Sequence, residues 1–193
     1  MSIEVEFVDK MGNDLSVVNA ARVSYEVWHD EFEKNDAGLI RYLAKHNHWT
    51  PFAHTSITFR IKAPIFVARQ LVKHQVGLVW NEVSRRYVDS KIEFYYPDNW
   101  RKRGGDSKQG SLQDEFVEYL DLADESLILS DINDIVGDLY DHCEEVYDKL
   151  LKAEVCPEQA RMVLPLASMT QWIWTGNVAS ISRVCNLRCA PDT

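Results

Sequence analysis

The chain has 193 residues, of which 46% are hydrophobic and 26% are charged, and its formal net charge is −9. This length and apolar content suffice for one well-buried domain and are short for two. The negative charge argues against a nucleic-acid backbone as the main partner. No apolar run approaches the roughly 18 residues of a membrane-spanning helix, and the N-terminus lacks the layout of a signal peptide. We therefore expect a cytoplasmic protein that binds neither nucleic acid nor membranes.

The first half of the chain predicts alternating short strands and helices. Residues 3–8 alternate between polar and apolar side chains, which predicts a strand. Residues 13–14 can cap a helix that ends near residues 24–25, and a second helix is expected over residues 37–45. Residues 54–62 alternate cleanly, as is typical of a half-buried antiparallel strand.

The second half predicts one more strand and a long helix. Residues 92–96 predict a strand, and the Gly-, Ser- and Lys-rich residues that follow, about 98–111, predict a flexible loop. Residues 112–155 are expected to be helical, with a break near residues 130–131 or 137 as an open alternative and with their many acidic side chains on a solvated face. A further helix is expected to begin at Pro157.

The sequence gives little indication of a metal site or of disulfide bonds. None of the four cysteines forms a CxxC pair, and without an export signal we expect them to be reduced and partly buried. Cys185 and Cys189 lie four residues apart on an expected helix, where we interpret them as packing residues. His48 and His54 are candidate ligands, but no Asp, Glu or Cys lies at ligand spacing from them. We predict no metal site.

The densest group of polar side chains lies in residues 69–87. A helix is expected to begin at Pro64, so that residues 69 and 73 share one stripe and residues 70 and 74 the next. Residues 81–87 are expected to form a polar loop leading into a strand. Arginine forks and hydroxyl donors suit phosphate oxygens, while amides and a carboxylate suit the edge of a base. This basic segment in an acidic chain favours a small anionic ligand.

The same residues resemble the signature of the flavin-dependent thymidylate synthases, the ThyX family. The family pattern is Gln-x-x-Arg-His-Arg, a short spacer, and then Asn-Glu-x-Ser-x-Arg-Tyr. In this chain it stands as Gln70-x-x-Lys73-His74-Gln75 followed by residues 81–87, so that Lys73 and Gln75 replace two arginines and the spacer is one residue longer. Lys73 keeps the charge but loses the bidentate fork, and Gln75 loses the charge. Such a variant signature suggests a viral or phage-like member of the family.

Shorter blocks elsewhere in the chain resemble the same family. They are residues 20–24 near the end of the first helix, the His-x-Thr-Pro-Phe-x-His block at residues 48–54, and the blocks at residues 160–165, 170–177 and 187–188. Within the second block, Ala53 stands where the family often carries Glu. On an ideal helix Asn177 and Arg188 would lie about 20° from the same face.

The resemblance implies a set of site residues. Arg188 would be catalytic, by polarising the uracil. The residues implied to bind the flavin cofactor are Ser24, Thr50, Lys73, His74, Gln75, Asn81, Glu82, Asn177 and Arg183. Those implied to bind the nucleotide are Gln70, Lys73, Glu82, Val83, Ser84, Arg85, Arg86, Arg161 and Arg188.

The resemblance also implies a fold and a reaction. The fold would be a single α+β domain over residues 1–193, with a twisted, mainly antiparallel sheet flanked by helices and without the family's further C-terminal helix. The reaction would be reductive methylation of dUMP to dTMP, with methylenetetrahydrofolate as carbon donor and NADPH as reductant through FAD, in a homotetramer with shared sites. Two alternatives stay open: hydroxymethyl transfer to a pyrimidine nucleotide by the same fold, and a non-catalytic nucleotide- or flavin-binding relative.

Overall fold

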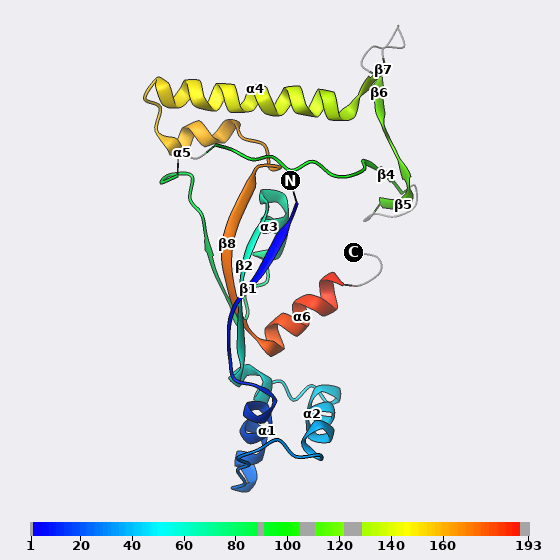
Figure 1. Ribbon diagram of the computed structural model, residues 1–193, viewed down its shortest axis with the longest axis vertical. Coiled ribbons are helices and arrows are strands. Elements are labelled where there is room, and N and C mark those ends of the chain that lie inside the picture. Colours follow the sequence, from blue (N-terminus) through cyan, green and yellow to red (C-terminus); the bar gives the residue numbers. More distant parts are fainter. Residues whose placement is uncertain (1, 89–90, 105–110, 122–128, 190–193) are drawn as a thin grey trace.

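The computed structural model describes residues 2–88, 91–104, 111–121 and 129–189 (Figure 1). Its centre is a four-stranded sheet in the order β1-β2-β8-β3, in which every neighbouring pair is antiparallel. The strands are β1 (Glu4–Met11), β2 (Ser56–Pro64), β8 (Met169–Asn177) and β3 (Leu78–Glu82). The predicted strands over residues 3–8 and 54–62 are confirmed.

One face of this sheet carries the main hydrophobic core. On β2 and β8 the alternation places Ile61 opposite Trp172, and both tryptophans of β8, Trp172 and Trp174, are buried. Helices α3 (Ile65–Leu71) and α6 (Val178–Arg188) supply Ala68 and Val184 to the same cluster. These two helices therefore cover the apolar face of the sheet, and the signature that follows α3 starts from a fixed position.

A small helical lobe connects β1 to β2 at one end of the sheet. It holds α1 (Asp14–Arg22), the 3-10 turn η1 (Val23–Tyr25), α2 (Asp36–Lys45) and the 3-10 turn η2 (Pro51–His54). The predicted cap of α1 is confirmed, because the Asn13 side chain accepts a hydrogen bond from Ser16 N at 3.1 Å. Both helices lie below the sheet in Figure 1.

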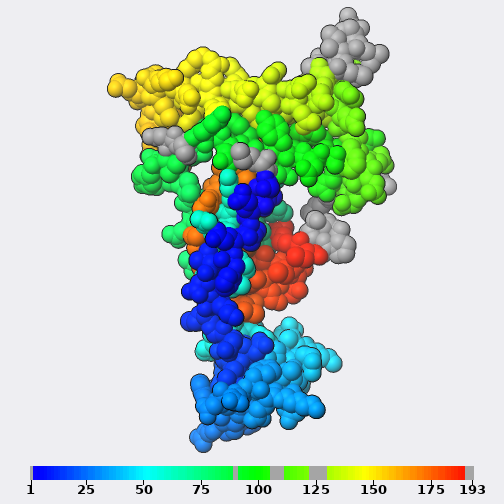
Figure 2. Space-filling view, viewed as in Figure 1, coloured from blue at the N-terminus to red at the C-terminus, as the bar shows by residue number. Residues whose placement is uncertain are grey.

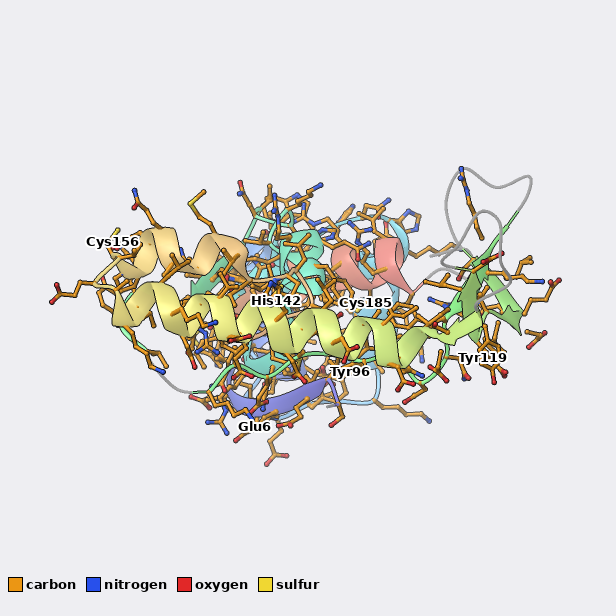
Figure 3. The ribbon with its side chains drawn as sticks, turned by 90° about the horizontal axis from the view of Figure 1, so that it is seen from above. Glu6, Tyr96, Tyr119, His142, Cys156 and Cys185 are labelled. Atoms are coloured by element: carbon orange, nitrogen blue, oxygen red, sulfur yellow. The ribbon has the colours of Figure 1, made fainter. Side chains whose placement is uncertain are left out.

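A second layer lies across the opposite end of the sheet. The 21-residue helix α4 (Ile132–Lys152) and the short α5 (Pro157–Ala160) share a separate core in which Phe94 stacks on Tyr140. In the space-filling view this layer and the lobe of α1 and α2 are joined by a narrower middle portion (Figure 2). Viewed from above, α4 spans the molecule, with Glu6 of β1 on one side and Cys185 of α6 on the other (Figure 3).

Several expectations for residues 92–155 are wrong. Residues 92–96 form no strand and make only an isolated bridge from Phe94 to Ser168, because their apolar side chains pack under α4 instead. The helix begins at Ile132, where Asp131 caps it, and not at residue 112. Before it lie two small hairpins, formed by β4 (Arg101–Arg103) with β5 (Ser111–Phe116) and by β6 (Tyr119–Asp121) with β7 (Leu129–Asp131).

The loop predicted over residues 98–111 is therefore partly wrong. Strand β4 lies within it, and residues 105–110 are outside the described part of the chain.

Candidate functional site

The residues after α3 form a tight turn instead of a further helical turn. The helix ends at Leu71, and His74 N donates to the carbonyl of Leu71 at 3.0 Å. Lys73 and His74 consequently lie beyond the helix, and the expectation that they extend its stripes from residues 69 and 70 is wrong. The low helix propensity of Val76 and Gly77 disfavours any continuation of the helix through this segment.

Gly77 allows this turn, residues 72–77, to pack closely against the start of α6. It has φ +73°, and a Cβ at this position would lie 2.2 Å from Ser180 Oγ and 2.6 Å from Asn177 Nδ2. The Gly77 carbonyl also accepts a hydrogen bond from Asn177 N at 3.3 Å. Only glycine combines this backbone conformation with such a close approach. The lack of a side chain at Gly77 thus allows the turn to pack directly against the start of α6.

Asn177 caps α6 and does not lie within it. Its backbone is extended, with φ −73° and ψ 157°, and its Oδ1 accepts from both Ser180 N and Ser180 Oγ at 2.9 Å. Ser180 Oγ in turn accepts from Arg183 at 3.0 Å. The helix-phase argument for Asn177 and Arg188 is therefore wrong, because β8 runs up to Asn177.

Arg188, the last residue of α6, contacts His74 of the turn. Its Nε donates to Nε2 of His74 at 3.1 Å. A pocket of 220 Å³ between turn and helix is lined by Lys73, His74, Gln75 and Arg183, among others. The chain thus brings four of the predicted flavin-binding residues together with the predicted catalytic arginine.

Two further hollows lie nearby, the first where α6 meets the helical lobe and the second within the lobe itself. The first, 380 Å³ in volume, is lined by aromatic side chains, including Trp49 and Phe52, and by Arg183. The second, of 650 Å³, is lined by Ser24 and Thr50 and also by Trp49. Both volumes fall in the range of small-molecule sites. The predicted residues Ser24 and Thr50 therefore share one hollow, and Arg183 lines both the first hollow and the turn pocket.

The other half of the signature lies further along β3. Asn81 and Glu82 belong to this strand, so the expected polar loop begins only after them, and as neighbours they point to opposite faces of the sheet. Leu78 pairs with Gly176 and Glu82 with Trp172, so roughly 13 Å of strand separates Glu82 from Leu78, the first residue after the turn. The predicted residues therefore fall into separate groups within one chain.

Ser84 and Arg86 form a compact polar pair after β3. The Ser84 hydroxyl oxygen accepts from Arg86 N at 3.3 Å and from Arg86 Nε at 3.2 Å. The Arg86 guanidinium lies over the Tyr87 ring, 4.9 Å from its centroid. Because the oxygen of Ser84 is occupied as an acceptor, its O–H remains a donor for an anion.

Three more predicted nucleotide-binding residues lie at the surface away from the turn pocket. Gln70 is exposed on α3, Val83 is exposed and donates its N–H to the carbonyl of Gln171, and Arg161 is exposed at the start of the 3-10 turn η3 (Arg161–Val163). Arg85 is half-buried beside Ser84. These side chains are not gathered around the pocket of Lys73 and His74.

Several residues that hydrogen-bond the predicted site residues were not themselves predicted from the sequence. Ser180 hydrogen-bonds the side chains of both Asn177 and Arg183. It lies three residues from each, and this helical spacing could have identified it from the sequence. Thr170 and Trp80 hydrogen-bond the Glu82 carboxylate. Trp80 could have been found from strand alternation, whereas Thr170 lies 88 residues from Glu82 and required the fold.

A buried carboxylate fixes the lobe that carries Ser24. Asp36 is fully buried and accepts from Glu33 N at 2.9 Å, from Arg22 at 2.7 Å and from His29 at 3.2 Å. The backbone hydrogen bond from Glu33, aided by Arg22 and His29, holds the pKa of Asp36 below its ordinary value in spite of burial. This cluster joins the end of α1 to the start of α2.

Other expectations concern cysteines, metals and membranes. All four cysteines are free, but only Cys143 is partly buried; Cys156, Cys185 and Cys189 are exposed, so the expected burial is wrong for these three and the interpretation of Cys185 and Cys189 as packing residues is wrong. Among the described residues no His, Cys, Asp and Glu side chains cluster in a way that would hold a metal ion. In the same part of the chain, no helix combines the length and apolar character that a membrane crossing requires.

The family model of the thymidylate synthase complementing proteins, Thy1, matches residues 6–193. The chain belongs to this family. It is similar to the flavin-dependent thymidylate synthase of Thermosipho melanesiensis, with 45% identity over 184 residues that cover 95% of this chain and 76% of that protein. The corresponding protein of Thermus thermophilus is 39% identical over 188 residues, covering 97% of this chain and 64% of that protein.

Solved structures support the same assignment. The crystal structure of the UMP/dUMP methylase PolB from Streptomyces cacaoi bound with 5-Br dUMP has a TM-score of 0.78 and 34% identity, covering 97% of this chain and 78% of that chain. The predicted α+β fold with an antiparallel sheet and helices is therefore confirmed. The activity of this Thy1 chain is flavin-dependent thymidylate synthesis.

The relatives named here come from cellular organisms, at 39–45% identity. They give no support to the viral or phage-like origin that the variant signature suggested.

Proposed function

We propose that this thymidylate synthase methylates dUMP at C5, with methylenetetrahydrofolate as carbon donor and NADPH as reductant through FAD. The observation that carries the proposal is the contact between the turn and α6. It places Lys73, His74 and Gln75 beside Arg183, and it ties Arg188 to His74 at 3.1 Å. These are the residues that the family signature assigns to flavin and uracil.

The side chains in this region fit a flavin dinucleotide by their chemistry. Lys73 and Arg183 offer cationic donors for a pyrophosphate, and the adjoining hollow offers aromatic walls from Trp49 and Phe52 for a ring system. The cofactor would be held by two sets of residues: Lys73, His74, Gln75, Asn177 and Arg183, and also Ser24, Thr50, Asn81 and Glu82. When bound, the flavin supplies the hydride chemistry, so the protein needs no nucleophile of its own.

The remaining residues bind and polarise the nucleotide. A guanidinium at the N3/O2 edge of uracil stabilises negative charge on the ring and makes C5 electron-rich, and Arg188 has this role. The 5′-phosphate is bound by the Ser84 hydroxyl and by the guanidinium groups of Arg85, Arg86 and Arg161. Gln70, Glu82 and the Val83 backbone orient the sugar or the base.

A homotetramer with shared sites explains why these groups are separate in one chain. The edge strand β1 is exposed along its whole length, and Val5 and Phe7 on it are 64% and 55% exposed. A second copy that covered this strand would bury apolar surface and bring its own polar groups to the site. Light scattering after gel filtration tests this arrangement, with a tetramer expected and a monomer contradicting it.

Flavin titration and product analysis test the proposed reaction. The purified protein is incubated with FAD, and its visible spectrum is recorded before and after addition of dUMP. We expect a flavin band that shifts with dUMP, and turnover with NADPH and methylenetetrahydrofolate to a product with the mass of dTMP. A product heavier by one oxygen would indicate hydroxymethyl transfer instead. Absence of a flavin band after incubation would overturn the enzymatic proposal.

A further inference from the structure

The carboxylate of Glu82 is held by two neutral donors. Thr170 donates from its hydroxyl to Oε1 at 2.7 Å, and the indole N–H of Trp80 donates to Oε2 at 3.3 Å. An exposed glutamate normally rotates freely and loses conformational entropy when it binds a ligand. Two donors on two different oxygens remove that freedom beforehand. Neither of the two donors is charged, so neither forms an ion pair with the carboxylate.

Both donors are themselves fixed by the sheet. Trp80 stacks on the buried Trp172, with ring centroids 4.4 Å apart and planes inclined by 17°. Glu82 pairs with Trp172, so alternation along β8 also places Thr170 on the face that carries Glu82. The Val83 N–H bond to the Gln171 carbonyl, at 2.9 Å, extends this pairing past the end of β3. The orientation of the carboxylate is thus set by the backbone register.

Close in sequence to the oriented carboxylate is a group suited to an anion. Ser84 and Arg86 stand two and four residues after Glu82, and the Ser84 O–H and the Arg86 guanidinium are both donors. A ligand that satisfies this segment has an anionic group for Ser84 and Arg86 and a neutral hydroxyl or N–H donor for Glu82. A pyrimidine nucleoside monophosphate has both.

We propose that Thr170 and Trp80 are positioning residues that orient Glu82 to accept a hydrogen bond from the sugar or base of the nucleotide. This inference rests on the assignment of Glu82 to the nucleotide in the proposed function. Thr170 acts only through Glu82, so its hydroxyl strengthens nucleotide binding only while the Glu82 carboxylate is present.

A double-mutant cycle on dUMP affinity tests this dependence in the FAD-loaded protein. Thr170→Val is expected to weaken dUMP binding about 10-fold, the usual range for a hydrogen bond to a charged group, and Thr170→Ser by less than about 2-fold. In a Glu82→Ala background, Thr170→Val is expected to add less than about 2-fold, since its partner is gone. Trp80→Phe keeps an aromatic ring but removes the N–H, and about 3-fold is expected because its bond is longer.

Thr175→Val is the matched control. Thr175 lies on the same strand, and its hydroxyl bonds Thr58 at 3.0 Å on the opposite face of the sheet. Thr175→Val is expected to leave both dUMP affinity and FAD affinity unchanged. Equal losses for Thr170→Val with and without Glu82, or a loss for Thr175→Val as large as for Thr170→Val, would overturn the proposal.

A measurement without nucleotide separates this proposal from the proposed function. In the ¹⁵N spectrum the indole resonance of Trp80, assigned by its absence in Trp80→Phe, is expected to shift in Glu82→Ala. An unmoved resonance overturns the positioning role. Failure of the wild-type protein to bind dUMP would instead contradict the proposed function, and the indole resonance would still decide whether Trp80 holds Glu82.

Discussion

Arg188 Nε donates a hydrogen bond to His74 Nε2 at 3.1 Å, which connects the last residue of α6 to the turn after α3. Because arginine is always a donor, Nε2 of His74 accepts and the ring proton lies on Nδ1. The contact fixes the Arg188 guanidinium before a nucleotide binds. Such preorganised charge is what stabilises a developing anion most effectively.

Arg188→Lys is expected to lower the turnover of dUMP about 100-fold, because a lysine lacks the planar fork and cannot bond His74 and the uracil edge together. FAD content per chain is expected to stay near that of the wild type. Steady-state kinetics and the visible spectrum measure the two quantities. Arg101→Lys, on the exposed strand β4, is the control and should change neither. Unchanged turnover in Arg188→Lys would remove Arg188 from the catalytic role.

Gly77→Ala is expected to separate the turn from α6. The new Cβ would overlap Ser180 Oγ at 2.2 Å, and φ +73° adds strain, so we expect a loss of about 2 kcal/mol in the free energy of unfolding and weaker FAD binding. Denaturant unfolding and fluorescence titration with FAD measure both effects. Gly38→Ala is the matched control, because Gly38 lies within α2 with no atom within 4 Å of its added Cβ. It should stabilise the protein by about 0.5–1 kcal/mol.

Lys73→Arg is expected to bind FAD about 3- to 10-fold more tightly. Lys73 stands where the family signature has arginine, and the guanidinium fork can grip a phosphate through two parallel hydrogen bonds. Fluorescence quenching during FAD titration gives the dissociation constant. Lys91→Arg, outside the turn pocket, serves as the control. Weaker FAD binding in Lys73→Arg would mean that Lys73 is not directed at a phosphate.

Asp36→Asn is expected to destabilise the lobe of α1 and α2 in a pH-dependent way. Because the folded chain holds the pKa of Asp36 below its ordinary value, the ionised carboxylate is the form that folding favours. Its contribution is fully present above the ordinary aspartate pKa of about 3.9 and is lost as pH falls through the lower, folded value.

Thermal melts at several pH values measure this effect. At neutral pH the variant should melt about 5 °C lower than the wild type, since it removes the ionised carboxylate that bonds Arg22 at 2.7 Å and His29 at 3.2 Å. The difference should close below about pH 4. Asp148→Asn, on α4, is the control. A difference that stays constant down to pH 2 would show that the charge of Asp36 is not the cause.

Local patterns were informative wherever the interaction that decides the structure is also local. The alternation of residues 54–62 predicted β2, and Asn13 predicted the start of α1 through hydrogen bonds to the third residue after it. The resemblance of the signature residues to the ThyX pattern predicted the family, and the match over residues 6–193 confirms it.

Predictions failed where distant residues compete for the same side chains. Phe94 has the pattern of a strand residue, but it is buried against Tyr140 of α4, and this packing leaves its segment with a single bridge. Residues 112–121 read as helical but pair as hairpins before Ile132.

The sequence by itself indicated the family and its activity, through the resemblance of its signature blocks, and it predicted strands β1 and β2, because their alternation is a local pattern; β3 and β8 were not predicted. Only the tertiary structure decided which of the predicted residues meet. Strand pairing between β3 and β8 brings Thr170 to Glu82, and the bare backbone of Gly77 brings His74 to Arg188, 114 residues away. Contacts at such separations are set by sheet register and core packing, which no local pattern encodes.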